Sequence, residues 1–274
     1  MLFVTVNGAS KKAVKLRARL EAMYLRYNRV DLIHPDPLEF VYRYTAAADR
    51  EIAGLVAACL AYGRVAQILA GVDRILKPMG PSPSLFLRTA RRDDVVAMAQ
   101  GFKHRWTTGA DVAGLLLGVK GTVAEFGSLE AAFRSVFRPD HQNVLPALCE
   151  WVGLLMRANG GQPIKLLASP ADGSACKRLL LFLRWMVRKD DVDPGVWSGI
   201  PPSKLLVPMD THMHRISLAL KLTRRKQADL RTALEVTHAF RQIAPEDPVR
   251  YDFALTRAGM RGETFSGRLR RRGT

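Results

Sequence analysis

The sequence predicts an all-α protein, and three observations support this. Apolar side chains recur at i, i+3 and i+4 spacing along most of the chain. Alternating strand patterns are nearly absent, and no period of 20–50 residues recurs, which argues against a solenoid. With 274 residues, 48% of them hydrophobic, the chain can bury a substantial core as one large domain or two closely packed subdomains.

The longest periodic stretch covers residues 50–76, and Asp49 just before it is a suitable N-cap. The "NGG" at 159–161 is a strong signal for the end of a helix. Proline-rich segments between the periodic stretches predict loops. Further helices are expected at 109–117, 128–136, 144–158, 174–188, 211–221, 227–243 and 248–259.

Positive charge dominates the composition. Lys and Arg number 42 against 25 Asp and Glu, a formal net charge of +17. Such a field favours polyanions, most often nucleic acid, although a membrane surface or ribosomal RNA would also satisfy it. The excess is spread along the chain, and the basic residues at 268–272 are expected to form a tail that adds affinity without specificity.

No segment suggests a membrane or an export signal. The apolar run at 179–183 is far shorter than the roughly 20 residues that a bilayer span needs, and no signal-peptide core follows Met1. Three scattered cysteines fit a reducing compartment and cannot supply the four ligands of an iron–sulfur cluster within one chain. We therefore expect a cytoplasmic protein that uses no membrane and no such cluster.

The segment 173–191 predicts a buried helix with one cationic face. Ser174 is a suitable N-cap, and Lys177 falls in the first turn, where the helix dipole disfavours a cation by about 0.3–1 kcal/mol. At about 100° per residue, Lys177, Arg184 and Arg188 lie within roughly 40° of one another. This stripe is either an ordinary solvated face or the rim of a cleft in which Lys177 is neutral enough to act as a nucleophile.

Asp210 lies in "PMDTHMHRI" (208–216), where three roles compete: helix cap, metal ligand and catalytic carboxylate. Pro208 before it and helical spacing after it predict an N-cap. In a helix, His212 and His214 point about 200° apart, so they cannot share a metal ion with Asp210. The cap and the catalytic role are compatible, because backbone N–H groups would hold the carboxylate ionised and fixed.

A lysine early in a helix followed by a Pro-x-Asp-Thr-His-x-x-Arg-Ile element resembles the helix-hairpin-helix DNA glycosylase superfamily. The 33-residue separation of Lys177 and Asp210 and the atypical "DGSACKRL" (172–179) are similar to its archaeal 8-oxoguanine glycosylase branch. Almost the whole chain resembles an uncharacterised bacterial family, of unknown activity, related to that branch. Leu180 stands where relatives are expected to have Asn. The matching stretches are 49–68, 173–197, 208–216 and 245–260.

The resemblance implies a fold of two helical subdomains with a cleft between them and an atypical hairpin. One would comprise residues 49–204, and the other 1–48 together with 205–274. Lys177 and Asp210 would line the cleft, and the segment 189–209 would cross between the subdomains. Its acidic residues Asp190, Asp191 and Asp193 are expected to serve turns and caps in preference to a cation site.

The implied activity is that of a DNA glycosylase and abasic-site lyase that excises an oxidised purine similar to 8-oxoguanine. Lys177 would form the Schiff base with Asp210 assisting, and neither a metal nor an organic cofactor would be needed. We expect a monomer that binds double-stranded DNA in the bacterial nucleoid. Residues expected to contact DNA or the base are Tyr62, Arg64, Gln67, Arg184, Trp185, Arg188, His212 and Arg215.

Two other classes of function remain open from the sequence. The first is a DNA- or RNA-binding protein that keeps the glycosylase fold without the chemistry. The second is a metal-dependent hydrolase that uses Asp210 and the two histidines. For Tyr251 and Asp252 we expect a buried structural role in preference to a place in the cleft.

Overall fold

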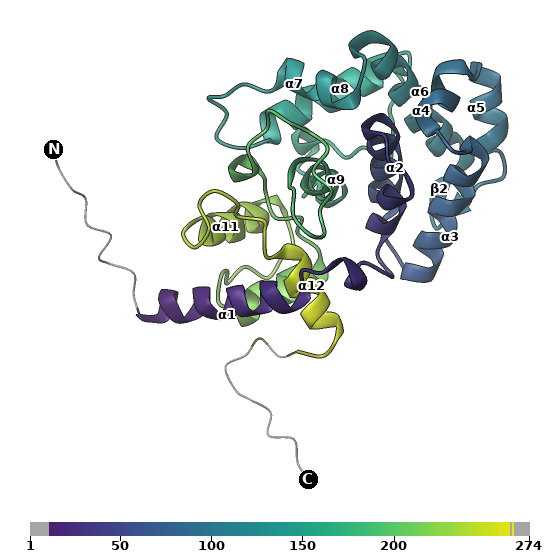
Figure 1. Cartoon of the computed structure of the whole chain (residues 1–274). Helices are drawn as coiled ribbons and strands as arrows, with labels where there is room; N and C mark the ends of the chain where they lie inside the picture. The colour runs from purple at the N-terminus through teal and green to yellow at the C-terminus, as the bar shows by residue number, and fades with distance from the viewer. Residues whose placement is uncertain (1–10, 264, 266–274) are drawn as a thin grey trace.

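In the computed structural model of the protein (Figure 1), residues 11–263 and 265 are described. The basic stretch 268–272 therefore lies outside the described residues. Within them the regular secondary structure is helical apart from one hairpin of two very short strands, so the predicted all-α class is confirmed.

The long helices follow the expected order, with extra ones at the N-terminus and between residues 83 and 99. The α-helices are α1 (Lys11–Tyr27), α2 (Ala47–Leu60), α3 (Val65–Leu76), α4 (Pro83–Thr89), α5 (Arg92–Ala99), α6 (Gly109–Phe126), α7 (Leu129–Val136), α8 (Leu145–Ala158), α9 (Lys177–Val187), α10 (Thr211–Ala219), α11 (Leu230–Arg241) and α12 (Asp252–Met260). Short 3-10 helices are η1 (Val30–Leu32), η2 (Pro37–Arg43), η3 (Lys77–Met79), η4 (Pro170–Asp172) and η5 (Pro202–Lys204). Strands β1 (Lys103–His104) and β2 (Thr107–Thr108) pair antiparallel.

Helix α9 lies in the middle of the molecule with α2 beside it (Figure 1). Gly54 of α2 leaves room for the Met186 side chain of α9, because an added Cβ would come within 2.9 Å of Met186 Cε. On one side α6 packs against α5, α7 and α8; on another, α12 packs against α1 and α10. Helix η2 packs on α2 across the expected boundary at residue 48, and the division into two subdomains stays a prediction.

The stretch predicted as one helix over 50–76 is two helices, α2 and α3. The chain turns at Gly63, whose φ of +97° is a conformation that side chains with a Cβ rarely adopt. Asp49 is also not the N-cap, because α2 begins two residues earlier, at Ala47. Its carboxylate instead accepts hydrogen bonds from Ser82 Oγ and Ser84 N, which ties α2 to the start of α4.

A buried carboxylate joins α2 to α7. Glu51 accepts hydrogen bonds from the backbone N–H groups of Leu129 and Glu130 at the start of α7. Burial raises the pKa of Glu51 to about 7 despite these two donors. Ser128, which accepts from Ala131 N, completes the cap of this helix.

No single helix among the described residues has the length and apolar character needed to cross a membrane. Only α6 and α7 meet those criteria as a pair, and they are bent by 72° where they join.

Candidate functional site: a lysine–aspartate pair at two helix starts

Lys177 is the first residue of α9, and an unusual turn leads into it. Cys176 before it has a φ of +48°, and its N–H donates to Ser174 Oγ at 3.1 Å. Ser174 therefore shapes the turn but is not the predicted N-cap, since the helix begins three residues later. No side chain caps α9, and its first turn contains no acidic residue. The carboxylate that faces Lys177 therefore comes from another helix.

Asp210 caps α10 as predicted. Its Oδ1 accepts hydrogen bonds from His212 N at 2.9 Å and Met213 N at 2.8 Å. Its other oxygen, Oδ2, lies 3.8 Å from Lys177 Nζ. One carboxylate thus does two things at once, because one oxygen is fixed by the helix and the other faces the lysine.

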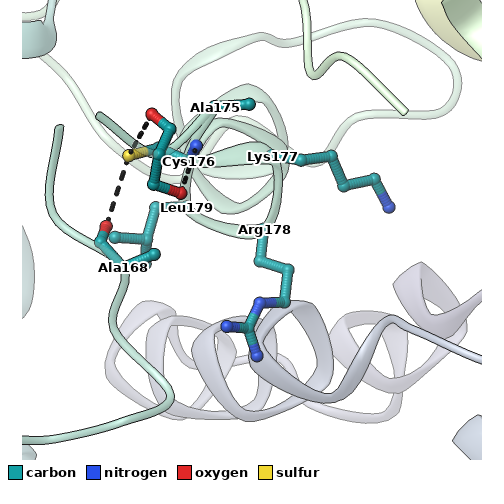
Figure 2. Close-up of a pocket in the computed structure, with 7 residues that line it drawn as sticks. Ala168, Ala175, Cys176, Lys177, Arg178 and Leu179 are labelled. Carbon is teal, nitrogen blue, oxygen red and sulfur yellow. Dashed lines mark hydrogen bonds between the residues drawn. The ribbon is translucent and has the colours of Figure 1, made fainter. Parts of the chain in front are cut away.

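The pair is within reach of solvent, with 25% of the Lys177 side chain and 34% of the Asp210 side chain exposed. A pocket of about 170 Å³ lies at the start of α9, lined by Ala168 and residues 174–179. Figure 2 shows Lys177 extending away from Cys176, whose Sγ donates to the carbonyl of Ala168. The amine is therefore accessible without a rearrangement of the helix.

The expected cationic stripe does not continue along α9. Arg184 and Arg188 are each only 3% exposed. Arg184 forms ion pairs with Asp193 and Asp252, and Arg188 with Asp190, Asp193 and Asp247. As placed, neither guanidinium can reach a DNA phosphate, which corrects the expectation that both contact DNA.

This buried ion network includes Asp190 and Asp193 of the loop after α9. Asp190 Oδ1 also accepts from the N–H groups of Val192 and Asp193, the turn role expected from the sequence. Burial raises the pKa of Asp252 to about 6; Arg184 opposes this shift, and the nearby charge of Asp210 adds to it. The charge of Asp210 therefore acts on the buried network through Asp252.

Trp185 is fully buried, so it cannot stack on a base as expected. Tyr251, 1% exposed, contacts Glu21 through its hydroxyl group, which agrees with a structural role. Arg64 and Gln67 are exposed around the turn from α2 to α3, and Tyr62 is half-buried there.

The two histidines after Asp210 have separate partners. His212 is exposed, and its Nδ1 lies 2.9 Å from Arg215 Nη2 on the same helix. His214 is buried, and its Nε2 lies 2.8 Å from the carbonyl oxygen of Arg225. No group of three metal-ligating side chains is found in the part of the chain that the structure describes.

Arg178, which the sequence interpretation overlooked, connects the site to the α2–α3 turn. It donates to the carbonyl of Cys59 at 2.8 Å, and its guanidinium lies 5.3 Å from the centre of the Tyr62 ring. In Figure 2 it points away from Lys177. The available signal was a second cation directly after Lys177, but helical periodicity alone does not say which neighbour it meets.

The fold and this site define an all-helical protein with an accessible Lys–Asp ion pair at the starts of two helices. The chain belongs to a family described as "Protein of unknown function (DUF2400)", whose model matches residues 36–261. Neither the comparison with curated proteins nor that with solved structures gave a match.

Proposed function

We propose that the protein is a DNA glycosylase with abasic-site lyase activity that acts on an oxidised purine. The observation that carries this proposal is the 3.8 Å separation between Lys177 Nζ and Asp210 Oδ2, two side chains that lie 33 residues apart in the sequence. A lysine nucleophile beside an ionised carboxylate is the pair that this chemistry requires.

In this proposal each group has a different task. At 3.8 Å the carboxylate attracts the lysine without a direct hydrogen bond, so the amine is free to move toward a substrate carbon. Asp210 itself stays in place, because two backbone N–H groups hold its other oxygen. A fixed negative charge of this kind stabilises the positive charge that develops on a sugar as its glycosidic bond breaks.

The reaction balances without an oxidant or a cofactor. Once its ammonium has given up a proton to Asp210 or to solvent, the amine of Lys177 bonds to C1′ while the glycosidic bond breaks and the base leaves with the bonding electrons, taking up a proton. Opening of the sugar ring and loss of an amine proton give a Schiff base between Nζ and C1′. Removal of a C2′ proton then expels the 3′ phosphate, and water releases the lysine.

The charge of the protein supports a DNA substrate. The excess of 17 positive charges favours phosphate contacts, which position a duplex without reading its sequence. The target nucleotide would have to leave the base stack to reach Lys177, and a damaged base makes that step less costly.

Borohydride trapping tests the proposal directly. Borohydride reduces a Schiff base to a stable amine, so the wild-type protein is expected to become covalently linked to a duplex containing 8-oxoguanine or an abasic site. Lys177→Ala should abolish the adduct, because no other amine lies beside Asp210 Oδ2 among the described residues. Asp210→Ala should reduce its rate of formation by roughly 100-fold or more, the scale of losing one electrostatic stabiliser.

Lys165→Ala is a matched control, since the Lys165 side chain is 83% exposed and pairs with Asp111 and not with Asp210. It should leave trapping unchanged. An equal adduct with Lys177→Ala, or none with the wild type on either duplex, would refute the lyase step.

A DNA- or RNA-binding protein without chemistry is the second candidate, favoured by the charge excess alone. It predicts salt-sensitive binding that shows no lesion preference and does not change in Asp210→Asn. Binding of damaged and undamaged duplexes with equal affinity, together with no trapping, would select this candidate.

A further inference from the structure

An exposed tryptophan lies at the tip of the β1–β2 hairpin. Arg105 and Trp106 are the two residues between the strands, whose register pairs His104 with Thr107. Trp106 is 66% exposed, whereas Trp151, Trp185 and Trp197 are at most 5% exposed. Trp106 is thus the one tryptophan of the four whose ring is open to a ligand.

The ring rests on a second aromatic side chain that is itself fixed. Tyr62 and Trp106 stack with 4.8 Å between ring centres and 13° between planes. The Tyr62 hydroxyl lies 2.5 Å from Thr107 Oγ1, and its carbonyl oxygen lies 2.9 Å from His104 Nε2. We call this pair of rings the aromatic platform; its position is set before any ligand arrives.

The backbone at the hairpin tip adopts an unfavourable conformation that places a cation over the platform. Arg105 has a φ of +54°, a region that favours Gly, Asn or Asp in two-residue turns. Its guanidinium lies 4.6 Å from the centre of the Trp106 ring. Gly63 makes room for it, because a Cβ there would lie 3.1 Å from Arg105 Cδ.

The three segments that meet around the platform carry no carboxylate. Residues 61–72, 95–110 and 174–189 contain neither Asp nor Glu. The cations that contact or adjoin the platform are Arg64, Lys103, Arg105 and Arg178. A π-face surrounded by uncompensated positive charge complements a nucleobase flanked by phosphates. A protein or membrane partner would instead favour further apolar side chains, and the turn offers Arg and Thr.

We propose that the aromatic platform binds an unpaired nucleobase of DNA by stacking on Trp106, with Arg105 moving from the Trp106 ring to the adjoining phosphate. The choice of DNA rests on the proposed function, whereas the stacking site does not depend on any chemistry at Lys177. Arg178 contacts Tyr62 and directly follows Lys177, so one residue links the platform to the proposed site of chemistry. In this proposal the protein holds distorted DNA at the platform and acts on it at the lysine.

Tryptophan fluorescence of the full-length protein provides the first test. Three of the four tryptophans are buried, so quenching by a stacked base reports on Trp106. A short duplex with one unpaired base should quench the emission, and its fully paired counterpart should quench it much less. Trp106→Phe should lose this signal while keeping an aromatic ring for binding.

Affinity, measured by fluorescence anisotropy of labelled DNA, provides the second test. Trp106→Ala should weaken binding of the duplex with an unpaired base by about 5- to 100-fold, the range found for loss of one stacked base. Binding of the fully paired duplex should change less than about twofold, and Trp106→Phe should bind within about threefold of the wild type. Arg105→Ala should lower the dependence of affinity on salt by about one phosphate contact, which Trp106→Ala should not.

Leu25→Ala is the matched control, since Leu25 is 78% exposed on α1. Equal affinity of Trp106→Ala and the wild type for the unpaired base overturns the proposal. Quenching by anionic lipid vesicles but not by DNA also overturns it.

The two proposals fail separately. If Trp106 controls binding but borohydride traps nothing, the platform stands and the lyase does not. If Lys177 is trapped while Trp106→Ala binds and reacts normally, the lyase stands and the platform does not.

Discussion

The cations at the two ends of α9 lie in opposite environments. At the first turn, Lys177 is 25% exposed in its side chain and faces a single carboxylate oxygen at 3.8 Å. At the last turn, Arg184 and Arg188 are buried among four aspartates. The same helix therefore carries one cation that solvent can reach and two cations that are buried in ion pairs. The difference lies in how many carboxylates the rest of the chain brings to each end.

The largest expected effect on stability comes from removing an aspartate at the buried end of α9. Asp193 is fully buried and pairs with both Arg184 and Arg188. Asp193→Ala leaves two buried guanidiniums short of a partner, and the free energy of unfolding should fall by about 3–5 kcal/mol. Chemical denaturation measures it. A loss below about 1 kcal/mol would mean that the two ends of the helix do not differ as described.

A smaller effect should appear in the dependence of stability on pH. The pKa of Asp252 is raised to about 6 from its usual 3.8, so between these values the folded state holds a proton that the unfolded state has lost. The contribution of Asp252 to stability is thus present below pH 4 and is lost as pH rises through 6. Its size is on the order of 2–3 kcal/mol.

Asp252→Asn should remove this component, so that the wild-type and variant stabilities differ in slope between pH 4 and 6. Denaturation at several pH values measures the slopes. Asp31→Asn, at a side chain 55% exposed, is the control and should keep the wild-type slope. Identical slopes for wild type and Asp252→Asn would contradict the raised pKa.

The smallest effects are expected at the open end of α9. Asp210→Ala removes an N-cap and should cost about 1 kcal/mol of stability. Lys177→Ala removes only a partly exposed ion pair, worth no more than about 1 kcal/mol. Thermal unfolding of both variants checks this. A cost of 3 kcal/mol or more for Lys177→Ala would make the lysine a structural residue like the two arginines.

The sequence predicted the parts of this picture that depend on neighbouring residues. Helical spacing gave the all-α class, and Pro208 with the apolar pattern after it gave the cap at Asp210. The family resemblance brought Lys177 and Asp210 together. The burial of Arg184 and Arg188 depends on ion pairs with Asp252 and Asp247, about 60 residues further along. No local sequence pattern indicates which arginine pairs with which aspartate.

Two other features escaped the sequence for physical reasons. The break between α2 and α3 depends on the conformation of Gly63 in a stretch that remains periodic on both sides. The hairpin that carries Trp106 has strands of two residues each, too short for an alternating pattern to be recognised.

The two oxygens of Asp210 make one common substitution harder to interpret than it looks. An asparagine at this position has only one oxygen, and the N–H groups of His212 and Met213 both need it. The amide would therefore turn its NH₂ group toward Lys177, placing donors against a donor. Asp210→Asn thus replaces an attraction with a repulsion instead of merely removing charge, so alanine is the cleaner way to silence this side chain.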